Sequence, residues 1–364
     1  GQVTLWAILP AVLYFGGIFI SVHLEAKKLG LKGIPRSELP RFKYLIRNVY
    51  LLLPLVFLIW MVTANIRSLQ FSAAIAILIS IAVSLVGTIC DASAEVRETK
   101  TGSVAGITAK KTGRMILDSL EAGGKGSITV AVACAMAGMI AGCITVTGLA
   151  SKLISGVIAI SSAIPNPTLS LLLALFLTML CCIVLGMGVP TTANYIIMAT
   201  TCAPILASGM GLNLMAAHMF CFYFGIVADI TPPVALAAYA GSAIAKAPPM
   251  KTAWNATRLA IAAFIIPYIF AYNNALIFVG NDVKFLSVAS IVISATLGMA
   301  SIASGLMGYL IRDMKWISRI ALVAGGLLMV IPGTVTDLAG LAVLVVVLVL
   351  QRIENKKDKA AASV

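Results

Sequence analysis

A break in the apolar segment 213–247 supplies oxygen groups that could bind a cation. The segment is interrupted by the run Ala228-Asp229-Ile230-Thr231-Pro232-Pro233-Val234. Because neither proline has an N–H group and the first disfavours helical geometry at the residue before it, carbonyl groups of residues 227–229 lose their helical partners. Free carbonyls and the Thr231 hydroxyl are ligands of the kind that hold alkali cations in transporters. Asp229, an acid deep in an apolar segment, is a cation ligand, a proton carrier, or a neutral or ion-paired residue at a helix end.

A second break lies in the apolar segment 168–207. Its two arms are separated by the run Gly186-Met187-Gly188-Val189-Pro190-Thr191-Thr192-Ala193-Asn194. Two glycines and a proline so close together end a helix. Inside a membrane, such a break is tolerated only where protein or a water-filled cavity satisfies the freed backbone groups. The break also brings the polar side chains of Thr191, Thr192 and Asn194 to membrane depth.

Two interrupted segments that meet near the middle of the bilayer are the usual construction of a secondary-transporter site. The N-terminal ends of the half-helices would offer positive dipole ends to a substrate carboxylate. The alternative is that each break only kinks a helix for packing. Because the two breaks occur in one chain and both carry polar groups, we favour a binding site.

The composition indicates an all-α polytopic membrane protein. Of the 364 residues, 60% are apolar and 11% are charged, whereas a soluble domain has roughly 25% charged residues. A spanning helix needs about 20 apolar residues and satisfies its own backbone groups in lipid. We expect spanning helices over the ranges 3–22, 49–65, 71–89, 127–147, 257–278, 285–310, 317–333 and 336–350.

The net charge of +13 is a topology signal rather than a sign of nucleic-acid binding. If the N-terminus is periplasmic and 168–207 is re-entrant, nearly all basic residues fall on the cytoplasmic side, in the stretches 26–47, 91–125, 246–258, 312–319 and the tail after 350. Lys and Arg mark cytoplasmic loops and attract anionic lipid there. This distribution predicts a bacterial inner-membrane protein with a cytoplasmic C-terminus and no nucleic-acid partner. The stretch Lys110–Lys125 is expected to form an amphipathic helix at the cytoplasmic surface.

Other classes of function find little support in the sequence. The seven cysteines lack the CxxC or Cys/His spacing that is typical of a metal site. An intramembrane protease would need a catalytic pair, but Asp229 is a single deep acid and HExxH does not occur. A channel would need rings of polar or acidic residues around a pore, whereas broken helices indicate an occluded site. We expect no enzyme activity, and no cofactor apart from a coupling cation.

The two breaks carry a family likeness. The stretches GMGVPTTANYIIMATTCAPIL and FGIVADITPPVALAAYAGSAIA resemble the large permease subunit of tripartite ATP-independent periplasmic (TRAP) transporters. The form ADITPPVALAAYA is most similar to fused permeases that work with TAXI-type binding proteins. The opening LPAVLYFGGIFISVHLEAKKLGLKG resembles the connection between the two inverted halves of this family. The likeness covers residues 1–280.

The resemblance implies an elevator-type transporter with inverted-repeat topology, a re-entrant hairpin at 168–207 and a discontinuous helix at 213–247. It implies import of a small organic acid, such as a dicarboxylate, by symport with Na⁺, or with H⁺ through Asp229. The implied partners are a periplasmic TAXI-type substrate-binding protein and a small four-helix permease domain, fused upstream or separate. The implied cation-binding residues are Gly186, Gly188, Ala228, Asp229, Thr231 and Val234. The implied substrate-facing residues are Pro190, Thr191, Thr192, Asn194, Pro232 and Pro233.

The resemblance also predicts the domain organisation. We expect the end of the first repeat and a basic linker at 1–48, linker helices with an amphipathic arm at 49–126, the second repeat at 127–280, and an appended three-helix segment with a basic tail at 281–364. The hairpin of the first repeat and the small permease domain are missing from this sequence, so we expect a fragment that does not transport alone. Many family members have glycine at the positions of Ala228 and Ala235, where a methyl group could crowd the loop or alter the ion. The alternative function is a carboxylate/cation symporter that uses no binding protein.

Overall fold

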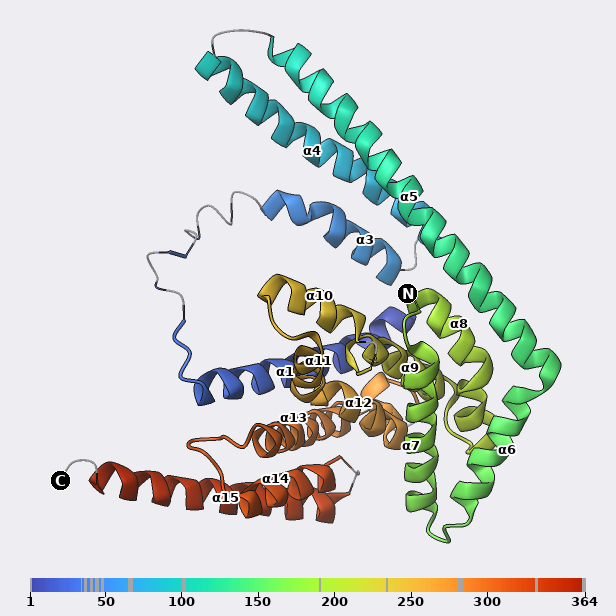
Figure 1. Ribbon diagram of the computed structural model, residues 1–364, viewed down its shortest axis with the longest axis vertical. Helices are drawn as coiled ribbons and strands as arrows, with labels where there is room; N and C mark the ends of the chain where they lie inside the picture. The colour runs from blue at the N-terminus through green and yellow to red at the C-terminus, as the bar shows by residue number, and fades with distance from the viewer. Residues whose placement is uncertain are drawn as a thin grey trace. The chain divides into compact units, whose positions relative to one another are not determined.

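The computed structural model of the chain is helical (Figure 1). It describes residues 2–33, 35, 38–39, 42, 46, 49–64, 68–99, 103–189, 191–233, 235–280, 284–330 and 333–361. Over these residues there is no strand, apart from an isolated bridge between Tyr309 and Asp313. The described part contains six helices that are long and apolar enough to cross a membrane: Gln2–Lys28, Gln70–Cys90, Pro167–Gly186, Pro249–Tyr272, Phe285–Met307 and Thr334–Lys356. The predicted class, an all-α polytopic membrane protein, is confirmed.

The chain divides into two compact units. The first unit comprises residues 1–7 and 32–131, and the second comprises residues 8–31 and 132–364. The division falls inside two long helices, α1 (Gln2–Lys28) and α5 (Val104–Thr147). Each unit is therefore described by itself.

The first unit packs α3 (Leu53–Thr63) against α4 (Leu69–Thr99), with the 3₁₀ turn η1 (Val49–Leu52) before α3. The Ser84 hydroxyl of α4 donates a hydrogen bond to the Met115 sulfur of α5, at 2.9 Å. Helix α5 runs without interruption through both the expected amphipathic segment 110–125 and the expected span 127–147. The expected boundary is absent because no proline separates the two segments, and glycine costs a helix only about 1 kcal/mol.

The second unit holds both of the breaks that the sequence predicts. Its first seven complete helices are α6 (Leu149–Ser162), α7 (Pro167–Gly186), α8 (Thr191–Thr201), α9 (Leu214–Val227), α10 (Leu236–Ala245), α11 (Pro249–Leu259) and α12 (Ile261–Tyr272). Three short turns lie between or after them: η2 (Ile205–Gly209), η3 (Ala228–Ile230) and η4 (Asn274–Ile277). Helix α9 packs against α7, α8 and α12 (Figure 1). The fully buried rings of Phe220, Phe224 and Phe270 fill the space around α9.

The two helices that precede the breaks begin at side-chain caps. Asn166 accepts hydrogen bonds from the N–H groups of Thr168 and Leu169 at the start of α7, where Pro167 occupies the first turn. Asn213 accepts from the N–H group of Met215 at the start of α9, at 2.9 Å. Asparagine caps and an early proline are strong helix-start signals, so the positions of α7 and α9 along the chain are fixed locally.

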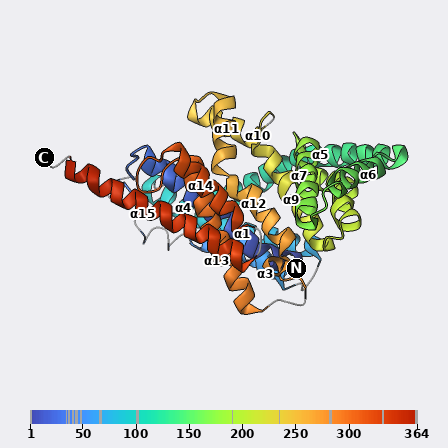
Figure 2. The ribbon, with the colours of Figure 1, turned by 90° about the horizontal axis from the view of Figure 1, so that it is seen from below.

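Three further helices follow η4 and pack in sequence: α13 (Phe285–Met307), α14 (Trp316–Leu328) and α15 (Thr334–Ala361) (Figure 2). Leu24 of α1 packs with Ala303 and Met307 of α13 in one hydrophobic cluster. Helix α13 also packs against α12. The three C-terminal helices are thereby joined to the helices around the breaks.

Candidate functional site

The end of α7 lies against the turn η3, which brings the two breaks together. Gly186 is the last residue of α7, and a methyl group built on it would lie 3.0 Å from the Cβ atom of Ala228. The same methyl would lie 2.8 Å from the side-chain nitrogen of Asn194. Non-bonded atoms do not approach so closely, so glycine is the residue that fits here without displacing its neighbours. Three predicted site residues, from α7, α8 and η3, meet at this junction.

Asn194 is turned into the protein and is 1% exposed. Its Nδ2 atom donates a hydrogen bond to the carbonyl oxygen of Gly225 in α9, at 3.0 Å. Its Oδ1 atom is buried and has no hydrogen-bond partner among the described residues. A buried amide oxygen without a partner costs about 1–3 kcal/mol, so such an atom is suited to a water molecule or an ion.

The break after α9 is less open than the sequence suggests. Thr231 has the extended backbone expected before a proline, with φ −101° and ψ 130°. Its hydroxyl donates to the Val227 carbonyl at 2.7 Å, and its N–H donates to the Ala228 carbonyl at 3.2 Å. Two carbonyl groups that we expected to be free are therefore satisfied by this one threonine. The hydroxyl oxygen of Thr231 keeps lone pairs with which it can still accept or ligate.

Other predicted residues surround the junction. The Asp229 side chain is half-buried and makes no hydrogen bond or ion pair within the described part of the chain. Gly188 is exposed in the turn between α7 and α8 and has φ +74°, a conformation that favours glycine. Thr191 and Thr192 are exposed in the first turn of α8. The structure therefore separates these two threonines from the buried Asn194.

The two prolines lead into α10. Pro232 is half-buried and Pro233 is exposed, and the Pro233 carbonyl accepts a hydrogen bond from the Tyr239 hydroxyl. Ala235 has φ +36° and is fully buried. An alanine in the left-handed region is strained, and here the packing of Ala235 with Ala238 and Ala253 holds it. The predicted site residues Pro190 and Val234 lie outside the described residues.

Two residues at the junction are not predicted from the sequence. A methyl group on Gly225 would lie 3.0 Å from the Met198 sulfur and 3.1 Å from Asn194 Nδ2, so this glycine permits the contact between α8 and α9. The Thr257 hydroxyl of α11 lies 3.0 Å from the Ile230 carbonyl, to which it can donate. Gly225 itself, three residues before Ala228, is a sequence signal for the close contact between α8 and α9. Nothing local to Thr257 signals the second, because it joins residues that are 27 apart.

Further polar contacts hold α8 against its neighbours. The Tyr195 hydroxyl lies 3.0 Å from Nδ1 of His218, which joins α8 to α9. Cys182, Cys202 and Cys221 are buried where α7, the end of α8 and α9 pack. Within the described residues there is no group of His, Cys, Asp or Glu that could hold a transition metal.

The junction has the chemistry of a site for a hard monovalent cation. It offers the unpartnered Oδ1 of Asn194, and the turn η3, which Thr231 follows, packs against the end of α7. Hard cations prefer oxygen ligands, and carbonyl-type oxygens at broken helices suit Na⁺. The residues present therefore fit a small alkali cation.

The model of one protein family matches most of the chain. Its description is "Tripartite ATP-independent periplasmic transporter, DctM component", and it matches residues 1–285. The match includes α7, α8, α9 and η3, and it ends at the first residue of α13. No curated protein and no solved structure matches the chain.

Proposed function

Since the chain belongs to the DctM component family of tripartite ATP-independent periplasmic transporters, we propose that it imports a small organic acid by symport with Na⁺. Members of this family are permease components for secondary transport, not enzymes, and they work with a periplasmic substrate-binding protein and a small permease. The family and the six apolar helices make the chain a multi-pass protein of the inner membrane. The finer statements below are proposals that rest on the site.

The observation that carries the proposal is the buried and unpartnered Oδ1 atom of Asn194, whose Nδ2 atom lies against Gly186 and Gly225. An amide oxygen in this position has a partner when a cation is bound to it and is left without one when the cation leaves. Na⁺ would be held by Asn194 Oδ1 together with backbone carbonyls and the Thr231 hydroxyl. The bound ion would supply positive charge beside the substrate carboxylate. It would also hold the end of α7 against η3.

The substrate proposal rests on the exposed first turn of α8. Thr191 and Thr192 present hydroxyl groups there, and the N-terminus of a helix carries free N–H groups and a partial positive charge. Both features suit a carboxylate, and dicarboxylates are the first candidates. The ion and the substrate would then occupy opposite sides of the α7–α8 turn.

The remaining proposals concern the assembly and the membrane. We infer a TAXI-type binding protein as the periplasmic partner, a periplasmic start of α1 and a cytoplasmic end of α15. The inverted-repeat relation and an elevator movement of α7–α10 belong to the same proposal. A complete substrate cavity would also need the family's other broken-helix half and the small permease domain.

The test is uptake by proteoliposomes that contain the chain with the small permease component, the other half of the permease and the binding protein. Radiolabelled small carboxylates are offered under an inward Na⁺ gradient or an inward H⁺ gradient, for wild type and Asp229→Asn. We expect the Na⁺ gradient to drive uptake in both, because the site needs neutral oxygens. The chain reconstituted without its partners is the control and should show no uptake.

Other outcomes would change the conclusion in defined ways. Uptake driven by H⁺ alone and lost in Asp229→Asn would make that carboxyl the proton carrier and would overturn the Na⁺ proposal. Uptake that does not respond to the binding protein would favour the alternative, a carboxylate/cation symporter without such a partner. Uptake that depends on neither gradient would overturn cation coupling.

A further inference from the structure

A groove on the outward face of α14 has a charged end and an apolar length. It has a volume of about 300 Å³, and its charged end is formed by Arg319 and Trp316. Ile320, Ala324 and Leu327 continue it along α14 on the exposed face of the helix. The opposite face of α14 carries the buried residues that pack against α13 and α15. Gly305 and Leu306 of α13 also line the groove, which therefore lies along the exposed edge where α14 meets α13.

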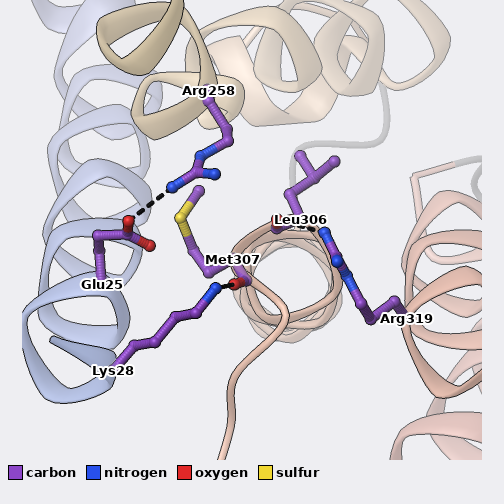
Figure 3. Close-up of polar contacts among 6 residues, drawn as sticks. All are labelled: Glu25, Lys28, Arg258, Leu306, Met307 and Arg319. Carbon is purple, nitrogen blue, oxygen red and sulfur yellow. Dashed lines mark hydrogen bonds and ion pairs between the residues drawn. The ribbon is translucent and has the colours of Figure 1, made fainter. Parts of the chain in front are cut away.

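Arg319 is held at this end by neighbouring groups. Its Nε atom donates to the Gly305 carbonyl at 3.0 Å, and its Nη2 atom donates to the Leu306 carbonyl at 3.1 Å (Figure 3). Its guanidinium also lies over the Trp316 ring, 4.6 Å from the centroid. Arginine has five N–H donors in a planar fork. Two donors are used within the described residues, so an edge of the fork is available to a phosphate oxygen pair.

The surroundings of Arg319 carry more positive than negative charge. Lys28 of α1 donates to the Met307 carbonyl at 2.7 Å, on the other side of the α13 end (Figure 3). Arg312 and Lys315 share the carboxylate of Glu354, at 3.7 Å and 3.5 Å. Around the loop between α13 and α14, the four basic residues Lys28, Arg312, Lys315 and Arg319 outnumber the two acidic residues Asp313 and Glu354. Such clusters next to apolar surface attract anionic lipid head groups.

The groove has the length of one bilayer leaflet. Trp316 and Leu327 are separated by 11 residues of one helix, which corresponds to a rise of about 16 Å. Half of the hydrocarbon core is about 15 Å thick. Tryptophan and basic residues at a helix start mark the membrane interface, so the charged end lies at head-group depth. An acyl chain in the groove would reach the middle of the bilayer.

We propose that this groove binds one anionic phospholipid, with its phosphate on Arg319 and an acyl chain along Ile320, Ala324 and Leu327. The lipid would cover side chains of α14 that are otherwise exposed. A second hollow of about 660 Å³ is lined by residues of α7 and α12, by Leu327 of α14, which also lines the groove, and by Val330; none of its lining residues is charged. A lipid in that hollow would not be selected by its head group, so the charge at Arg319 distinguishes the proposed site.

The experiment measures lipid retention by native mass spectrometry. The purified chain is stripped of lipid in detergent and titrated with phosphatidylglycerol or phosphatidylcholine of identical acyl chains. We expect one tightly held phosphatidylglycerol and at least about fivefold weaker retention of phosphatidylcholine, since one basic residue near a membrane surface contributes about that factor. Ala324→Phe should fill the groove and reduce phosphatidylglycerol retention about tenfold. Ile317→Phe places the same side chain at an exposed position of α14 outside the groove and should leave retention unchanged.

Arg319→Gln tests the charge, and its melting temperature is compared with wild type because Arg319 also holds the end of α13. We expect Arg319→Gln to lower phosphatidylglycerol retention to the level of phosphatidylcholine. If the variant is unstable, the comparison of the two lipids on the wild-type chain tests the charge. Equal retention of the two lipids would overturn the proposal, as would equal effects of Ala324→Phe and Ile317→Phe. Loss of bound phosphatidylglycerol when the small permease is added would show that a protein segment occupies the groove, which would also overturn it.

Discussion

Two helix contacts in the second unit depend on glycine, but they differ in the polar atoms that they enclose. Where α13 meets α14, a methyl group on Gly326 would lie 2.7 Å from the Gly298 carbonyl oxygen. The buried Ser301 hydroxyl there donates to the Leu322 carbonyl at 2.9 Å. Where α7 meets η3, the contact at Gly186 encloses Asn194, whose Oδ1 atom has no partner among the described residues. Close packing alone is therefore structural, and the proposed cation site rests on the unpaired Oδ1 atom of Asn194 at a helix break.

The largest effect is expected for Asn194→Leu. If Oδ1 ligates Na⁺, the apparent Na⁺ affinity of uptake should fall by about 100-fold, which is roughly 2.7 kcal/mol. Leucine has nearly the same shape but cannot donate to the Gly225 carbonyl, so the melting temperature should fall by an amount that corresponds to about 1–3 kcal/mol. Thr178→Val is the matched control, because Thr178 of α7 also has a buried and unpaired oxygen but precedes Gly186 by two helical turns. Equal losses in both variants would mean that the junction has no special role.

Gly326→Ala should destabilise the protein without changing the Na⁺ dependence of uptake. The added methyl meets backbone atoms of α13, and overpacking of this kind costs about 1–3 kcal/mol. Thermal unfolding in detergent measures this loss. Gly241→Ala, where a methyl would meet no atom within 4 Å, should be neutral or slightly stabilising in α10. A change in Na⁺ affinity for Gly326→Ala would remove the distinction between the two contacts.

Gly186→Ala should lower the Na⁺ affinity more than the stability, which is the reverse of the result expected for Gly326→Ala. Its methyl would press on Asn194 Nδ2 and on the Ala228 methyl, so we expect about a tenfold loss of Na⁺ affinity, or roughly 1.4 kcal/mol. The change in unfolding temperature should be smaller than for Gly326→Ala, because side chains can yield more readily than backbone. A stability loss with unchanged Na⁺ affinity would make Gly186 a packing residue.

The smallest effect is expected at the ion pair between Glu25 of α1 and Arg258 of α11, whose N and O atoms are 2.6 Å apart (Figure 3). Both side chains are partly exposed, so a double-mutant cycle with Glu25→Gln and Arg258→Gln should give a coupling of about 1 kcal/mol. The cycle is measured on unfolding free energies. A coupling near zero would show that packing alone holds α1 to α11.

The sequence predicts the breaks well and the junction only in part. Prolines and glycines act on the backbone locally, so the ends of α7 at Gly186 and of α9 before Pro232 follow from the chain itself. The inward direction of the Asn194 side chain cannot be predicted from the sequence in this way, because an apolar membrane helix has no polar face that reveals which of its sides is buried. The bond from the Thr231 hydroxyl to the Val227 carbonyl is a local contact between residues four apart, of a kind that threonine commonly makes, so it could be predicted from the sequence. The continuous helix α5 was missed because charge patterning suggested a boundary that the backbone does not require.

The bond between Lys28 and the Met307 carbonyl joins residues that are 279 positions apart. At roughly 5–20 residues per second, synthesis of that interval takes on the order of 15–60 s. During that time, Lys28 in the last turn of α1 cannot form its bond, because the Met307 carbonyl has not yet been synthesised. Helix α1 therefore gains this contact only long after it is made, and a ribosome that stalls before residue 307 leaves a nascent chain in which α1 lacks its bond to α13.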